Sequence, residues 1–293
     1  MATFAHTKFV CPPTKALFFP VAQADFLHPK EQKMAKNFTM DDVTILHEDN
    51  SILVVVKPQN MPSQADSSGD LDLLTLLKNY IKEKYNKPGN VYLGLVHRLD
   101  RPTGGVMVFA KNSKSAERLS KQIAEREMVK QYLTTVLGGP AEHKGTLVNY
   151  LKKNALTNNV YVATFGDHDA KRAELSYEVL EQTEHTSLVK VQLGTGRSHQ
   201  IRVQFSAINC PVWGDMRYGG DILGKGHNLA LWAYRLEFEH PISKEHMVFV
   251  AYPPAKQPWT AFDIAKHVEQ FSDDSEDDGV ALYTKPHTVD HLD

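Results

Sequence analysis

The chain has 293 residues, of which 42% are hydrophobic, and its formal net charge at pH 7 is −2; this length and composition suit one or two globular domains. No stretch approaches the roughly 20 apolar residues of a membrane span, so we expect no contact with a membrane. The N-terminus has no basic region followed by an apolar core, so we expect no secretory signal. The only two cysteines, Cys11 and Cys210, are far apart, which predicts a reducing, cytoplasmic location and no metal site built on cysteine.

Charge is distributed unevenly along the chain. Residues 272–278 hold five acidic residues and no basic one, and without them the rest of the chain has a net charge of +3. Residues 98–130 contain eight Lys and Arg against four Asp and Glu. This local excess suits a phosphate backbone, although a solvated helix surface explains it nearly as well.

In chain order, residues 1–40 contain four prolines and no clear periodicity, which predicts an irregular arm. A folded domain is expected over 41–263, with helices that begin near Asp72 and Ser113, each as the N-cap, and just after Arg197. From residue 264 the chain turns polar and acidic, and we expect a disordered tail over 264–293. Apolar runs and alternation predict strands at 43–46, 52–56, 106–110, 129–137, 173–181, 186–193, 229–238 and 247–250.

Many short strands with few helices between them predict an α+β fold with a mostly antiparallel or mixed central β-sheet and flanking helices. One stretch carries most of the chemistry. Residues 97–105 read HRLDRPTGG, so a carboxylate, Asp100, stands between two arginines and before turn residues. The apolar run that follows would hold this loop on a buried strand. Residue types alone leave two interpretations open, a catalytic carboxylate or a structural ion pair with Arg98 or Arg101.

Four segments, in this order, resemble the signature motifs of the RluA-type pseudouridine synthases, which isomerise chosen uridines in RNA. They are HRLDRPTGG at 97–105, KQYL at 130–133, LGTGRSHQIR at 193–202 and GDMRYG at 214–219. The sequence departs from the family pattern where Gly104 replaces the usual Ser, Ser198 the usual Thr, and Trp232 the His of an L-H-A motif. The resemblance implies the pseudouridine synthase catalytic fold, with its active site in a central cleft across the sheet.

The resemblance also implies roles for individual residues. Asp100 would be the carboxylate that acts beside the ribose, by attack, by charge stabilisation or by removal of a sugar proton. Tyr132 would stack on uracil and place its hydroxyl near the ring. Arg197 would pair with a buried Asp100, and Arg98 would help to extrude the target base.

Other positions have two interpretations each. Contacts with RNA, or a role in holding the loops, are expected for His97, Arg101, His199, Gln200 and Arg202. Leu229 and Leu231 would line the base pocket or simply belong to the core. No cofactor and no metal are expected, because the isomerisation involves no oxidation and needs no energy source.

The resemblance therefore predicts an RNA pseudouridine synthase that acts as a monomer on structured rRNA or tRNA. Two alternatives remain open at this point. One is a non-catalytic RNA-binding module that keeps the fold, and the other is an Asp-dependent nucleoside hydrolase.

Overall fold

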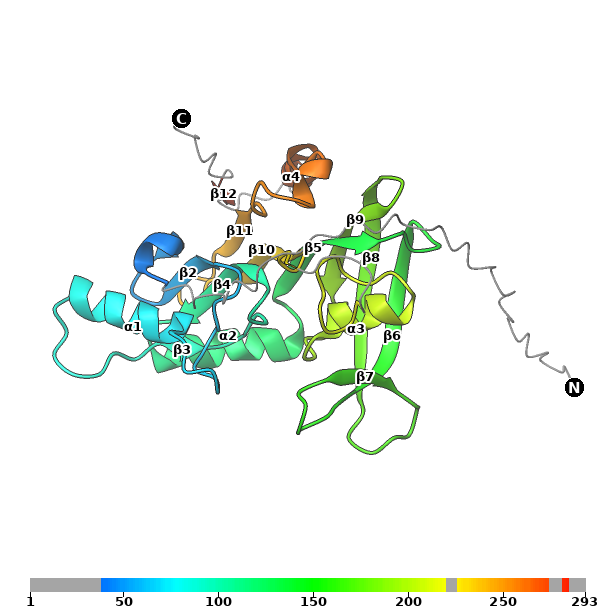
Figure 1. The fold of residues 1–293 in the computed structure, drawn as a ribbon. Helices are drawn as coiled ribbons and strands as arrows, with labels where there is room; N and C mark the ends of the chain where they lie inside the picture. The colour runs from blue at the N-terminus through cyan, green and yellow to red at the C-terminus, as the bar shows by residue number, and fades with distance from the viewer. Residues whose placement is uncertain (1–37, 220–225, 274–280, 285–293) are drawn as a thin grey trace, which may run out of the picture. The chain divides into compact units, whose positions relative to one another are not determined.

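The computed structural model describes residues 38–219, 226–273 and 281–284, so nearly all of the arm expected at 1–40 lies outside the described residues. Twelve strands of this part of the chain form one sheet (Figure 1). The strands are β1 (Thr44–Glu48), β2 (Ile52–Lys57), β3 (Gly94–Leu95), β4 (Gly104–Ala110), β5 (Val129–Leu137), β6 (Lys144–Lys153), β7 (Val160–Ala163), β8 (Lys171–Gln182), β9 (Thr186–Leu193), β10 (Leu231–Glu239), β11 (His246–Ala251) and β12 (Ala281–Thr284).

The order of the strands is β1-β2-β4-β10-β5-β9-β8-β6-β7, with β3 on β4, and β11 and β12 beside β10. Most pairs are antiparallel, but β4 and β10 pair in parallel, as do β11 and β12. The expected α+β class with a mixed central sheet is confirmed. Because β10 lies between β4 and β5, this late strand joins the strands of residues 44–110 to strands β5–β9 within the sheet.

The described residues form four α-helices and two short 3-10 helices. They are η1 (Met40–Asp42), α1 (Leu73–Lys84), α2 (Ser113–Glu125), α3 (Gln200–Ala207), η2 (Trp259–Ala261) and α4 (Ile264–Asp273). Asp72 caps α1 as predicted, with its carboxylate accepting from Thr75 N at 3.0 Å. The cap predicted at Ser113 is wrong by one residue, because Asn112 Oδ1 accepts from Ser115 N at 2.8 Å. None of these helices is both long and apolar enough to cross a lipid bilayer.

The tail expected to be disordered from residue 264 is ordered over two segments. Helix α4 buries Val268 in the main core, and Glu181 at the end of β8 binds both Asp263 N, at 3.2 Å, and His267 Nε2, at 3.0 Å. Strand β12 pairs with β11. The prediction is wrong there because two apolar residues at helical spacing, Ile264 and Val268, were outweighed by the acidic run that follows. The predicted strands do not include β3, β6, β7 and β12.

Two departures from the family pattern meet in the sheet. Gly104 lies directly beside Trp232 in the parallel β4–β10 pair, and a Cβ added at Gly104 would stand 2.2 Å from Cζ3 of the Trp232 ring. The ring is buried and its Nε1 donates to Ala251 O at 2.9 Å. A serine at 104 therefore has no room while tryptophan stands at 232, so each of the two departures fits the other sterically.

This coupling can be measured by a double-mutant cycle. We expect Gly104→Ser to lower the free energy of unfolding by about 1–3 kcal/mol, since it overpacks a closed site. In a Trp232→His background the same change should cost much less, because the ring that it meets is gone. Denaturant unfolding of the four proteins checks this, and strictly additive effects would contradict the shared space.

Candidate active site

The three residues expected to do the chemistry share one cavity. Asp100, Tyr132 and Arg197 all line a hollow of about 740 Å³, between the β3–β4 loop, strand β5 and the β9–α3 loop. Five further predicted residues line it too: His97, Arg98, His199, Gln200 and Arg202. Of the two leucines expected at the base pocket, Leu231 lines the cavity, whereas Leu229 is buried in the core outside it.

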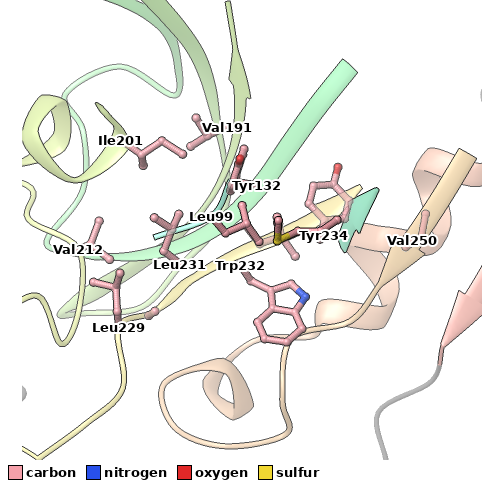
Figure 2. Close-up of a cluster of buried hydrophobic side chains, with 14 of the residues drawn as sticks. Leu99, Tyr132, Val191, Ile201, Val212, Leu229, Leu231, Trp232, Tyr234 and Val250 are labelled. Atoms are coloured by element: carbon pink, nitrogen blue, oxygen red, sulfur yellow. The ribbon is translucent and has the colours of Figure 1, made fainter. Parts of the chain in front are cut away.

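Apolar side chains form the wall behind Tyr132. Figure 2 shows its ring among Leu99, Val191 and Leu231, with Ile201 of α3 close by. Tyr132 is buried on β5, opposite Val191 of β9. Burial, and then the charge of Asp100, raise the pKa of its hydroxyl above the usual value. The phenol is therefore protonated at neutral pH, and it stands near the carboxylate.

Hydrogen bonds to the main chain hold the loop that carries Asp100. The Ser63 hydroxyl donates to Leu99 O at 2.7 Å, and Thr103 N donates to Asp100 O at 3.0 Å across the turn. Arg101, which was expected to contact RNA, uses its guanidinium within the protein: it donates to Asn60 O at 3.1 Å and to Ser68 and Asp70.

A lysine that sequence reasoning passed over lies under the same loop. Lys57 is fully buried at the end of β2. Its ammonium donates to Pro58 O at 3.0 Å, Met61 O at 2.6 Å and Arg101 O at 3.1 Å. Burial lowers the pKa of Lys57 to about 7, although the charge of Asp100 acts to raise it. The sequence feature that could have indicated this buried lysine is its position at the end of an apolar strand, immediately before a proline.

The partner of Asp100 is not the arginine that was expected. Arg202 Nη1 lies 3.6 Å from Asp100 Oδ2, and both side chains line the cavity. The same guanidinium makes a two-pronged contact with Asp215, from Nε to Oδ2 and from Nη2 to Oδ1, each at 2.7 Å. Burial acts to raise the pKa of Asp215, but the bonds from Arg202 and from two backbone N–H groups outweigh it, so this pKa is lowered.

Arg197, expected in a buried pair with Asp100, is exposed. Its Nε donates to Arg172 O at 3.0 Å. The prediction of the pair is wrong because α3 begins only at Gln200, which leaves Arg197 in the preceding loop and places Arg202 in the first turn of the helix. Both arginines stand in the LGTGRSHQIR segment, and the spacing alone did not say which one faces the carboxylate.

Two more predicted RNA contacts make bonds within the protein. His97 Nε2 accepts from Val108 N at 3.1 Å, and burial, helped by the charge of Lys130, lowers the pKa of this histidine to about 3. Gln200 Oε1 accepts from Thr195 Oγ1 at 2.7 Å and from Arg197 N at 3.0 Å. Both residues thus hold the loops of the cavity, which is the second of the two roles expected for them.

The cavity is strongly cationic. Its described lining holds one carboxylate, Asp100, against five basic side chains: Arg98, Arg126, Lys130, Arg197 and Arg202. Lys130 lies two residues before Tyr132 on β5, so both side chains point to the same face of the sheet. Burial lowers the pKa of Lys130. A polyanion therefore meets positive charge at this cavity even though the whole chain is slightly acidic.

Comparisons with known proteins agree with this geometry. The family described as RNA pseudouridylate synthase matches residues 51–207. A relative from Aquifex aeolicus (strain VF5), named an uncharacterized RNA pseudouridine synthase, is 36% identical over 220 residues, which cover 71% of this chain and 68% of that protein. The ribosomal large subunit pseudouridine synthase C of Yersinia pestis is 34% identical over 209 residues, covering 69% of this chain and 63% of that protein.

Solved structures share the fold. Human RNA Pseudouridylate Synthase Domain Containing 4 is 25% identical with a TM-score of 0.58, over 67% of this chain and 84% of that one. Human RNA Pseudouridylate Synthase Domain Containing 1 is 23% identical with a TM-score of 0.62, over 83% and 99% respectively.

The sheet, the cavity and these matches define the class of protein as an RNA-modifying isomerase. The chain belongs to the RNA pseudouridine synthase family, and within it to the RluA type whose four motifs it carries.

The stability of the protein should depend on pH through Lys57. Its pKa falls from a usual value of 10.5 to about 7 in the folded chain, so the unfolded chain binds more protons at this group between those values. The free energy of unfolding should therefore contain a contribution that rises from about pH 7 to about pH 10 and is lost as the pH falls back. Denaturant unfolding across this range should show a smaller rise in Lys57→Met than in the exposed control Lys82→Met. Equal slopes would contradict the shift.

The two arginines of the third motif should differ in stability. Arg202→Met leaves Asp215 buried and unpaired, which should cost about 3–5 kcal/mol of unfolding free energy. Arg197→Met removes an exposed side chain and should stay within about 0.5 kcal/mol of the parent. Thermal and denaturant unfolding of both variants give the comparison, and a larger loss in Arg197→Met would refute the pairing described here.

Proposed function

We propose that this protein converts one or a few uridines of a structured RNA into pseudouridine, with Asp100 as the reacting carboxylate and Tyr132 at the base. The proposal rests chiefly on one observation, the position of Asp100 beside Tyr132 in a cavity lined by five basic side chains. Ribosomal RNA is the preferred substrate class, because several relatives are named ribosomal large subunit pseudouridine synthases; tRNA stays the second candidate. Action as a monomer in the cytoplasm stays a prediction.

The reaction needs a group that acts on the sugar while the base turns. The bond between N1 of uracil and C1′ of ribose breaks, and the electron pair leaves with the base. A new bond then forms from C5 to C1′, C5 loses its proton and N1 gains one, so atoms and charge balance. An ionised Asp100 can stabilise or attack the electron-poor ribose, or remove a sugar proton.

The base must first leave its stack. Arg98 is exposed and lines the cavity next to Asp100, where a long cation can occupy the space that an extruded nucleotide vacates. Tyr132 and Leu231 offer flat and apolar contacts for uracil inside the cavity. Arg202, instead of Arg197, would stabilise the negative charge of Asp100. Arg197 and Lys130 would bind phosphates of the RNA backbone.

Asp100→Asn tests the proposal. The variant keeps the size of the side chain but removes the negative charge, so pseudouridine formation should fall by at least about three orders of magnitude, while affinity for RNA stays within a few-fold. Pseudouridine mapping of total RNA from cells that carry the parent or the variant identifies the target, and purified protein with that RNA gives the rates. Equal pseudouridine levels with the variant would refute a catalytic Asp100.

The same preparation separates the two alternatives. A non-catalytic RNA-binding module would bind RNA but leave every uridine unchanged in the parent protein. A nucleoside hydrolase would release free uracil from uridine, whereas the proposed isomerase leaves free uridine intact and releases no uracil from RNA.

A further inference from the structure

One hydrogen-bonded chain runs from strand β7 to the edge of the active site. Val160 N donates to the phenol oxygen of Tyr218 at 2.9 Å, and the same oxygen lies 2.7 Å from His199 Nδ1. Because the phenol oxygen already accepts from Val160 N, we assign the Tyr218 hydroxyl as the donor to His199 and Nδ1 of the imidazole as the acceptor. Burial lowers the pKa of His199, although the charge of Asp100 acts to raise it, so the ring is neutral. Because Nδ1 accepts, the single proton of the ring lies on Nε2.

The protonated nitrogen faces the reacting carboxylate across a gap. His199 Nε2 lies 3.9 Å from Asp100 Oδ2, and Arg202 Nη1 lies 3.6 Å from the same oxygen. Both distances are too long for a direct hydrogen bond. His199 and Asp100 both line the cavity, where their side chains are 16% and 29% exposed. One further oxygen atom between His199 Nε2–H and Asp100 Oδ2 could therefore form a hydrogen bond with each of them.

The chemistry of the sugar selects which oxygen that is. Two ribose oxygens lie near the reacting bond: the ring oxygen O4′, bonded to C1′, and the 2′-hydroxyl, bonded to the neighbouring C2′. O4′ gives up electron density as positive charge develops on the sugar, so a donor held against it would oppose the reaction. The 2′-hydroxyl can accept from Nε2–H and donate to Asp100 Oδ2 at the same time, and hydrogen bonds to the equivalent hydroxyl strengthen in the transition states of glycoside cleavage.

We propose that His199 binds the 2′-hydroxyl of the target nucleotide, together with Asp100, and that the site thereby selects RNA over DNA. The inference rests on the proposed function and deepens it. The left-handed backbone of His199 (φ 51°) at the start of α3 and the bond from Tyr218 hold the ring in this orientation.

The test combines a change in the protein with the removal of one oxygen from the substrate. Two target RNAs are used, identical except that the second carries 2′-deoxyuridine at the modified position. Single-turnover rates and dissociation constants are measured for the parent and for His199→Asn, which tolerates a left-handed backbone but is too short to reach the gap. Removal of the oxygen should cost the parent about tenfold in affinity or rate. His199→Asn should lose about the same factor on the ribo RNA and little on the deoxy RNA.

Two further variants complete the design. His199→Gln keeps an N–H donor near the position of Nε2 and should recover part of the preference for the ribo RNA. His185→Ala removes an exposed histidine of the β8–β9 turn and should leave the ratio between the two RNAs unchanged. Thermal unfolding of each variant shows whether it is folded.

The outcomes separate the inference from the proposed function. Equal losses for both RNAs in His199→Asn, or a parent that binds and converts them equally well, would overturn the role of His199. A parent that forms no pseudouridine in either RNA would refute the proposed function, and the ratio of dissociation constants would still decide whether His199 reads the 2′-hydroxyl.

Discussion

The buried pair of Arg202 with Asp215 is the interaction on which the site depends. It ties the first turn of α3 to the turn at 214–219 and leaves one arm of the guanidinium toward Asp100. An arginine suits this position because its planar group contacts one carboxylate with two nitrogens and still offers a third. Since Asp215 holds two nitrogens of Arg202, the third stays 3.6 Å from Asp100 instead of forming a close pair, and the carboxylate still lines the cavity.

A second set of contacts holds the loop that carries the carboxylate. The Lys57 ammonium donates to three backbone carbonyls, one of them that of Arg101, and the Ser63 hydroxyl donates to Leu99 O. Bonds to the main chain thus hold the loop next to Asp100, and Arg202 of α3 lies near the carboxylate itself. Because these bonds hold the loop, we expect the site to be formed before substrate binds.

Much of this arrangement could be predicted from the sequence, because the motifs carry it. Strand periodicity located the predicted strands near β1, β2, β4, β5, β8, β9, β10 and β11, and the motif around Asp100 located the cavity. Three features could not be predicted, each for a physical reason. The choice between Arg197 and Arg202 depends on where α3 begins; the order of α4 depends on Glu181, which is distant in sequence; and the fit of Trp232 over Gly104 depends on strand pairing.

The position of β10 between β4 and β5 has a consequence for biosynthesis. Asp100 precedes β4, whereas Tyr132 lies on β5 and Arg202 follows β9. On the ribosome, these two portions of the sheet stay without a shared strand until residues 231–239 have emerged. The nascent polypeptide therefore acquires a complete cavity only after residue 239 has been translated, and early termination before that strand leaves two incomplete portions of the sheet with exposed edges.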